Sequence, residues 1–524
     1  MSARPSFVLF VTDQHRADHL GCYGNSIVRT PHIDSIAARG ARFERFYVAS
    51  PICMPNRATL MTGRMPSATG VRSNGIPLSV EDVTFVDLLR SAGYRTALVG
   101  KSHLQNFTGG PPLYEVETPP GRVRPPAALA EANRHRRIGD LYDNERNPCW
   151  EDADHSVRTP FYGFDEVRLC TGHGDQVGGD YGRWLAERHD DPESLRGPAN
   201  ALPDNRDAAP QAWRTRVPEE LYPTAFVAEE AMSFLDRHAI DGNEPPFFLQ
   251  VSFPDPHHPF TPPGRYWDMY GSDEIELPES FGVGSSPMLE RIREMGVSGQ
   301  RTGTLPFMVT EQEARRIIAL TYGMITMIDD AIGRIMSKID ALGLSDRCVV
   351  AFTSDHGDAM GEHGVMLKHL IHFHGLLRVP FVWADPEVNG RGSVIEDLAG
   401  TIDIASTILA RAGLAPYHGI QGRDLFDHDL IPPPGMIIEE DYQRGVLGFE
   451  SPPRVRTLVT DDWRLTIRDG VEWGEMYHLR TDPFEIDNQY GEAGSAAMRS
   501  RLFETMVRCI IALQDRSPAA TGRA

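Results

Sequence analysis

Two groups of polar residues follow predicted strands at points where they could bind one cation. Residues 6–12 and 347–355 are short apolar runs rich in Val and Phe, which predicts two buried strands. The carboxyl ends of parallel strands meet at one edge of a sheet, so the polar residues at these two ends are expected to surround a single divalent cation. Oxygen ligands suit Ca²⁺ or Mg²⁺ and an imidazole favours Mn²⁺, so we expect Ca²⁺ or Mn²⁺. The proposed ligands are Asp13, Gln14, Asp355 and His356. Either group alone could instead cap a turn.

A cysteine stands in an unusual setting at residues 50–64, "SPICMPNRATLMTGR". Cys53 is followed by Pro55 and Arg57, and then by a Thr-Gly-Arg turn. A buried structural thiol needs no such neighbours. The chain has six cysteines and no Cys-x-x-Cys pair, which argues against a disulfide framework and against a cysteine zinc site.

Length, composition and charge exclude several classes of protein. The chain has 524 residues, so we expect one large domain and a smaller one. Its formal net charge of −21 argues against general nucleic-acid binding. It has no apolar run of about 18 residues, so no membrane span is expected. The apolar run near the N-terminus is too short for a secretory signal, and we expect a cytoplasmic enzyme.

The order of predicted elements favours a mostly parallel sheet covered by helices. Strands are predicted at 41–48, 95–101, 246–253 and 380–385, and helices at 30–40, 84–93, 224–238, 310–343 and 403–413. Thr30 and Pro31 begin the first helix, and Thr310 and Glu313 form a capping box on the longest. Residues 105–215 are rich in Pro, Gly, Arg and Asp, and we expect long surface loops with short elements there. From about 436 short strands predict an antiparallel subdomain, which gives domains at 1–435 and 436–524.

These motifs together resemble the sulfatase family. "CMPNRATLMTGR" resembles its Cys-x-Pro-x-Arg signature, and "VTDQH" and "SDHGDAMGEHG" resemble its two metal-binding strand ends. "ALVGKSHL" and "PHHPF" resemble further pocket segments. The resemblance runs from residue 6 to about 490 and is thinnest over 105–215. It implies an alkaline-phosphatase-like α/β/α sandwich with a large mostly parallel sheet and a small C-terminal antiparallel sheet.

The resemblance also implies a mechanism and a role for each pocket residue. In that family the cysteine is oxidised to formylglycine by a formylglycine-generating enzyme, and one hydroxyl of the hydrated aldehyde attacks the sulfate ester. Arg57 is implied to orient this group, the two lysines to neutralise sulfuryl oxygens, His257 to protonate the leaving alcohol, and His103 to take the proton that releases sulfate. The implied catalytic residues are Cys53, Arg57, Lys101, His103, His257 and Lys368. The spacing from Lys368 to Arg378 is about one residue longer than usual in the family.

Other residues and functions stay open at this point. Asn74 is a further candidate for the pocket, and five histidines could either line it or pack beneath it: His15, His363, His369, His372 and His374. A phosphonate monoester or phosphodiester hydrolase with the same nucleophile is the main alternative, and a binding protein with an unmodified Cys53 is another. We expect a homo-oligomer that acts on a small sulfate ester. The loops at 105–215 and 260–305 are expected to select its alcohol part.

Overall fold

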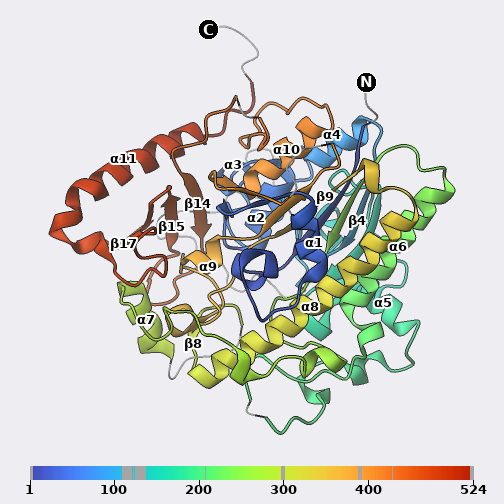
Figure 1. Ribbon diagram of the computed structural model, residues 1–524, viewed down its shortest axis with the longest axis horizontal. Coiled ribbons are helices and arrows are strands. Elements are labelled where there is room, and N and C mark those ends of the chain that lie inside the picture. Colours follow the sequence, from blue (N-terminus) through green and yellow to red (C-terminus); the bar gives the residue numbers. More distant parts are fainter. Residues whose placement is uncertain are drawn as a thin grey trace.

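A nine-stranded mixed sheet forms the centre of the computed structural model, which describes residues 4–108, 121, 123, 137, 139–206, 208–296, 301, 303–387, 392–427 and 429–519 (Figure 1). In sheet order its strands are β12 (Ser393–Ile395), β2 (Ala41–Phe43), β11 (Phe381–Ala384), β9 (Cys348–Ser354), β1 (Ser6–Thr12), β7 (Phe247–Ser252), β4 (Arg95–Gly100), β5 (Glu166–Thr171) and β6 (Gly178–Gly179). The five consecutive strands from β9 to β5 are parallel, whereas β11 and β6 run antiparallel to their neighbours. The sheet is therefore mostly parallel, as predicted.

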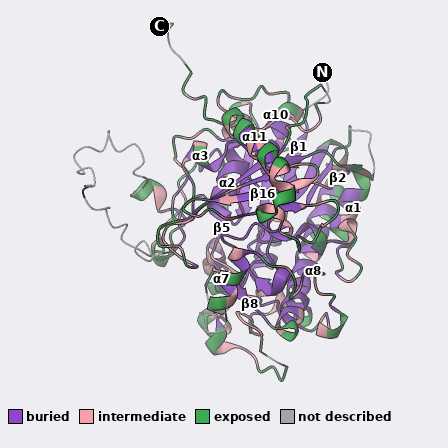
Figure 2. Ribbon diagram, turned by 90° about the vertical axis from the view of Figure 1, so that its left-hand side faces the viewer, coloured by how far each residue is buried: buried purple, intermediate pink, exposed green. Residues whose placement is uncertain are grey.

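Helices cover both faces of this sheet and make a three-layered core. One face packs against α1 (Pro31–Arg39), α5 (Asp180–Ala186), α6 (Pro223–Ile240) and α8 (Glu311–Ala341), and the other against α2 (Cys53–Thr62), α4 (Phe85–Ser91) and α10 (Ile404–Arg411). Side chains of β1 alternate between the layers: Val8 and Phe10 join the first cluster, and Phe7 and Leu9 join the second. Burial on both faces is the reason this strand is a continuous apolar run, and Figure 2 shows the sheet as the buried centre.

Shorter elements complete the fold. They are α3 (Pro66–Thr69), α7 (Pro287–Gly296), α9 (His374–Leu377), and two small sheets made of β8 (Phe307–Met308) with β10 (Val365–Met366) and of β3 (Phe46–Tyr47) with β13 (Ala399–Gly400). Among the described residues, no helix combines the length and apolar character that crossing a lipid bilayer requires.

A separate four-stranded antiparallel sheet lies beside the main one near the C-terminus. It consists of β14 (Met436–Asp441), β15 (Arg454–Val459), β16 (Trp463–Arg468) and β17 (Gly474–His478), followed by α11 (Ala496–Ala512) (Figure 1). Ile438 of β14 and Met506 of α11 belong to the same buried cluster as Leu9 of the main sheet. The predicted small antiparallel sheet is confirmed, and the domain boundary at 435/436 stays a prediction.

The predicted helix starts are confirmed where a specific capping residue marks them. Pro31 begins α1 directly after Thr30. The Thr310 hydroxyl accepts from the backbone N–H of Glu313, and the Glu313 carboxylate accepts from that of Thr310, so α8 begins with the predicted capping box.

Two predictions for the N-terminal half need correction. Residues 41–48 were expected to form one alternating strand, but they form β2 and β3, which pair in different sheets. The break falls at Glu44 and Arg45, where Arg45 turns outward and pairs with Asp461 at 2.9 Å. A period-2 pattern does not reveal a change of partner sheet.

The expectation of long surface loops with short elements at 105–215 also needs correction, because this segment contributes two strands to the main sheet. Its described part supplies β5, β6 and α5, which extend the main sheet at one edge. Composition concealed these elements because β5 is only six residues long and includes Glu166 and Arg168 among its apolar residues. The parts of this prediction at 109–120, 122, 124–136, 138 and 207 lie outside the described residues, as do 297–300 and 302 of the second loop.

Candidate active site

The candidate site lies where four neighbouring parallel strands end. In sheet order these are β9, β1, β7 and β4, and each delivers a polar segment to the same edge. The expectation that the strand ends at Asp13 and Asp355 meet is therefore confirmed. β7 leads into His257, and β4 into Lys101. Gly100 allows this approach because its φ is +104° and a Cβ there would lie 1.8 Å from the carbonyl oxygen of Ser252.

Cys53 is the first residue of α2, and its side chain points at the strand ends. Its Sγ lies 3.1 Å from Nε2 of His356 and 3.0 Å from Nζ of Lys368. Burial raises the pKa of the Cys53 thiol, but the Lys368 ammonium and then the His356 imidazole lower it more, to about 7. The positive end of the helix also favours a negative group at this position. The site is thus arranged to hold an anionic or nucleophilic group at residue 53.

The arrangement of donor atoms fits a divalent cation. Ligand atoms of Asp13, Cys53, Asp355 and His356 all lie within 4.8 Å of one another. All four residues are buried, and Oδ1 of Asp13 has no hydrogen-bond partner. A buried carboxylate oxygen without a partner is costly, and a cation would satisfy it.

Gln14, the residue after Asp13, has a free amide oxygen. Its Nε2 donates to the Asp358 carboxylate at 2.6 Å and lies 3.2 Å from Nδ1 of His258, which fixes the orientation of the amide. Its Oε1 is consequently left buried and without a partner. The backbone of Gln14 adopts a left-handed φ of 64°, and its N–H donates to Asp355 at 3.1 Å. These bonds involve the backbone N–H and the amide nitrogen of Gln14 and leave its amide oxygen without a partner.

His356 has the tautomer that a metal ligand needs. Its Nδ1 donates to the carbonyl oxygen of Gly357 at 2.9 Å, so Nε2 presents a lone pair toward Asp13, 3.5 Å away. Burial lowers the pKa of His356, but Asp355 and Cys53 raise it more. In a cluster of carboxylates a proton and a cation compete for this nitrogen, and a bound cation takes the place of the proton.

Arg57 ties the two strand ends together. Its Nε donates to Asp355 at 2.7 Å, its Nη2 lies 3.5 Å from Asp13, and its Nη1 donates to the Lys101 carbonyl at 2.9 Å and to Ser252 Oγ at 3.0 Å. Two buried carboxylates would repel each other without such a cation. This geometry places Arg57 where its charge offsets that of the two carboxylates.

Lys101 and Lys368 approach the site from different sides. The Lys101 ammonium pairs with Asp13 and lies 2.7 Å from Nε2 of His173. The Lys368 ammonium lies 2.7 Å from His356 Nε2 and 3.3 Å from His257 Nε2, as well as against Cys53. The longer spacing after Lys368 therefore does not prevent its side chain from reaching residue 53.

Both ring nitrogens of His257 have hydrogen-bond partners. Its Nδ1 donates to the carbonyl oxygen of His258, so Nε2 accepts from Lys368. Burial, followed by the neighbouring His173 and His258, holds the pKa of His257 well below its usual value. The His257 ring is therefore neutral at rest. To donate a proton to a leaving group, the ring must first take one from the Lys368 ammonium or be protonated in response to a bound anion.

His103 and Asn74 contact groups around the site. The His103 ring stacks on Phe107 with centroids 4.0 Å apart, and its backbone N–H donates to the buried Glu145 at 2.7 Å. Burial holds the pKa of His103 well below its usual value. Asn74 accepts from the backbone N–H of Met54 at 3.0 Å, next to Cys53.

Most of the other histidines have structural contacts instead. His369 and His372 both donate to the buried carboxylate of Glu440, at 3.1 and 3.0 Å. His15 lies against Thr12 and His363 against the Val283 carbonyl. The His374 backbone N–H donates to Glu485, and its ring packs edge-on against Tyr47.

Three residues of the site were not predicted from the sequence. Asp358 and His258 orient Gln14, and both stand inside motifs that had already been recognised, "SDHGD" and "PHHPF". His173 has no such signal except its place directly after the β5 run, "VRLCTGH". This signal is weak because the segment at 105–215 is rich in Pro, Gly, Arg and Asp and has little periodicity.

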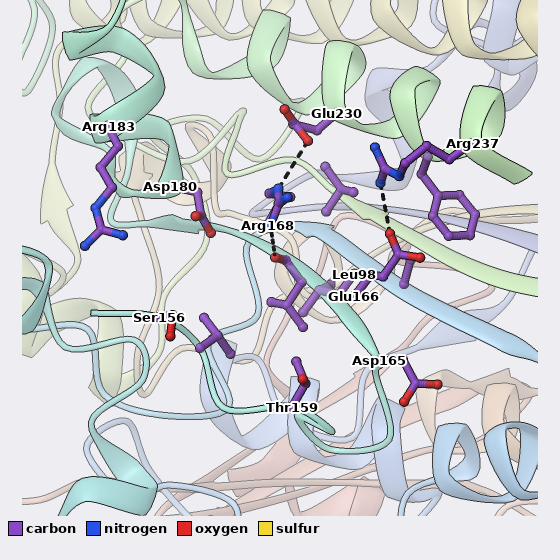
Figure 3. A pocket seen from close by; sticks show the side chains of 15 residues that line it. Leu98, Ser156, Thr159, Asp165, Glu166, Arg168, Asp180, Arg183, Glu230 and Arg237 are labelled. Carbon is purple, nitrogen blue, oxygen red and sulfur yellow. Dashed lines mark hydrogen bonds and ion pairs between the residues drawn. The ribbon is translucent and has the colours of Figure 1, made fainter. Parts of the chain in front are cut away.

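A cavity elsewhere in the molecule is a weaker candidate for a binding site. A cavity of about 280 Å³ lies beside β4 and β5, and the described residues that line it include none from the strand-end cluster (Figure 3). Much of its charge is paired: Arg168 lies 3.3 Å from Glu230, and Arg237 lies 2.9 Å from Glu166. Such pairing leaves little charge to attract a ligand.

Comparison with known proteins identifies the family. A family model described as Sulfatase matches residues 5–414. The chain belongs to the sulfatase family. It is thus a sulfuric ester hydrolase, and the resemblance stated from its motifs is confirmed. A second model, the C-terminal part of N-sulphoglucosamine sulphohydrolase, matches residues 361–511.

Individual relatives of this sulfatase extend over almost its whole length. An arylsulfatase of Clostridium perfringens is 28% identical over 496 residues, covering 93% of this chain and 90% of the relative. The multifunctional alkaline phosphatase superfamily protein PehA of Trinickia caryophylli is 26% identical over 530 residues, covering 94% and 93%. The solved phosphonate monoester hydrolase of Agrobacterium radiobacter superposes with a TM-score of 0.76 at 24% identity, covering 99% and 98%. This last likeness shows a shared fold.

Proposed function

We propose that this sulfatase hydrolyses sulfate monoesters of phenols or alcohols, with formylglycine made from Cys53 as the nucleophile. The observation that carries the proposal is the position of Cys53 Sγ, which lies between Lys368 and His356 and within 4.8 Å of two carboxylates. A nucleophile there contacts both a cation, Lys368, and a proposed metal ligand, His356. The arylsulfatase relative supports the same activity.

The proposed cation is one divalent ion, Ca²⁺ or Mn²⁺, held by Asp13, Gln14, Asp355 and His356. Its contribution when bound is to polarise a sulfate oxygen and to lower the pKa of the attacking hydroxyl. The unpartnered oxygens of Asp13 and Gln14 support this assignment. Their oxygen-rich character favours a hard ion, and the single imidazole is compatible with Mn²⁺.

The remaining residues act on charge and on protons. Arg57 keeps the two carboxylates together, so that the ligand oxygens stay at one place. Lys101 and Lys368 offset the negative charge of the sulfuryl oxygens. His257 Nε2 faces Lys368, so these two residues form a path by which a proton reaches the leaving oxygen. His103, stacked on Phe107, is the proposed acceptor of the proton that frees sulfate.

Phosphonate monoester hydrolysis is the second candidate. It is favoured by the Asp13-Gln14 and Asp355-His356 pairs, which resemble that group, and by the overall likeness to the Agrobacterium radiobacter phosphonate monoester hydrolase. The Gly-Lys-Ser-His segment at Lys101 and His103 favours sulfate instead, because an extra cation and imidazole suit sulfuryl transfer. One pocket can stabilise both transition states, so both activities in one enzyme are compatible with this site.

Two measurements test the proposal. Mass spectrometry of the peptide containing Cys53 should find formylglycine when the protein is produced together with a formylglycine-generating enzyme. The modified, metal-loaded enzyme should then turn over 4-nitrophenyl sulfate with a higher kcat/KM than 4-nitrophenyl phenylphosphonate. The reverse preference would support the second candidate, and an unmodified thiol in active protein would refute the formylglycine nucleophile. A homo-oligomer and a cytoplasmic location stay predictions.

A further inference from the structure

His173 lies at the end of a fifth parallel strand beside the site. It follows β5, which pairs in parallel with β4, so the strand-end rule brings it to the edge where Lys101 lies. Its side chain keeps 19% of its surface exposed, whereas those of Lys101 and Asp13 are completely buried. His173 thus stands between the buried cluster and the outside.

The His173 ring is held by one stacked and one edge-on ring contact. It lies parallel to the His257 ring, with centroids 3.7 Å apart and an interplanar angle of 11°, and His257 in turn stacks on His258 at 4.0 Å. Phe107 meets His173 edge-on at 5.5 Å. Ring stacking restricts rotation about the last side-chain torsion, so His173 limits the directions in which His257 Nε2 can point.

His173 also restricts the ammonium of Lys101. An ammonium has three N–H donors. One is taken by Asp13 and a second by Nε2 of His173 at 2.7 Å, so only one direction is left for a substrate oxygen. A four-carbon side chain with a single fixed contact would sample several directions.

We propose that His173 is a positioning residue that orients two groups of the site at once: the His257 ring through stacking and the Lys101 ammonium through a hydrogen bond. The inference rests on the proposed function, in which His257 serves the leaving oxygen and Lys101 the sulfuryl oxygens. It gives the segment at 105–215 a role inside the pocket, beyond the expected rim.

Separate variants remove the stacking contact and the hydrogen bond one at a time. His173→Phe keeps a flat ring against His257 but loses the nitrogen near Lys101. His173→Gln keeps a polar acceptor but loses the ring. His173→Ala loses both, and His32→Ala, at an exposed histidine on α1, is the control.

The assay uses a series of phenyl sulfates whose phenols differ in pKa. Proton donation matters most for poor leaving groups and contributes about 10²- to 10⁴-fold where it is needed. We expect His173→Ala and His173→Gln to lower kcat about 100-fold for phenyl sulfate and at most about 10-fold for 4-nitrophenyl sulfate. His173→Phe should keep the wild-type dependence on the leaving group but raise KM, and His32→Ala should match the wild type.

Several results would overturn the inference. An equal loss for all esters, or Phe and Gln variants that behave alike, would mean that His173 only supports the fold. A crystal structure of His173→Ala with an unmoved His257 ring would refute it independently of turnover. A wild-type enzyme that cleaves no sulfate ester would refute the proposed function instead, and the same phenols as phosphonate monoesters then test His173.

Discussion

Removing the charge of Glu440 should loosen the segment that carries Lys368. Glu440 lies fully buried on β14 and accepts from His369, from His372 and from the backbone N–H of Leu370 at 2.9 Å. Non-glycine residues on both sides of Lys368 have left-handed backbones: φ is 70° at Leu367, 83° at His369 and 61° at Leu370. Each such residue costs about 1–3 kcal/mol, and the bonds to Glu440 offset that strain.

The structure gives the size of the effect. Burial raises the pKa of Glu440, but the hydrogen bonds from His369 and His372 lower it more, to about 2 from the ordinary 4.5. This difference corresponds to about 3 kcal/mol of stabilisation by the ionised carboxylate. Because the folded-state pKa is depressed, the stabilisation is present above about pH 4.5 and is lost as the pH falls toward 2. Glu440→Gln should remove most of it.

We expect Glu440→Gln to lower the free energy of unfolding by about 3 kcal/mol at pH 7 and to lower kcat about 10-fold, because Lys368 Nζ shifts from residue 53. Urea unfolding followed by tryptophan fluorescence, and turnover of an aryl sulfate, measure the two effects. The difference in stability from the wild type should shrink below about pH 4.5. Glu472→Gln, at an exposed carboxylate, is the control. If Glu440→Gln matched this control in both stability and kcat, Glu440 would not hold the segment that carries Lys368.

Three further predictions concern the site itself. Asp13→Asn removes a proposed ligand and the partner of Lys101, so bound metal measured by mass spectrometry should fall from about one ion per chain to nearly none, and an unchanged metal content would contradict the ligand set. Arg57→Lys replaces a fork that contacts Asp355, Lys101 and Ser252, so kcat should fall about 100-fold while the surface change Arg39→Lys has no effect; equal activity of the two would refute the bridging role. Every residue of α2 is buried, so a formylglycine-generating enzyme added to the folded, unmodified protein should leave Cys53 a thiol by peptide mass, although it converts the unfolded chain; conversion of the folded chain would mean that α2 opens readily.

The strands β1 and β9 and the start of α8 could be predicted from local patterns. β1 and β9 are short apolar runs, and each ends where the polar residue of the motif begins. The capping box at Thr310 and Glu313 set the start of α8 because the reciprocal bonds of a helix start involve residues only three apart. Strand-end residues then follow from one general rule for parallel sheets.

Local patterns failed where the outcome depended on distant partners. The run at 41–48 divides between two sheets because β2 pairs with β11 and β3 pairs with β13. β5 has only a weak local pattern, with Glu166 and Arg168 among its six residues, and its place in the sheet is set by its pairing with β4. The place of His173 in the site could not be predicted without β5, the strand that it follows.

The sequence by itself determined which chemical groups this sulfatase has: a cysteine in a Cys-x-Pro-x-Arg setting, acidic strand ends, and lysines and histidines in recognisable segments. Those groups depend on residue type and short spacing, which a sequence displays directly. Only the tertiary structure decided how they are oriented. The free oxygen of Gln14 depends on Asp358, the position of Lys368 on Glu440, and the plane of His257 on His173. Each of these contacts joins strands or loops that are distant in the chain, and the packing of the sheet brings them together.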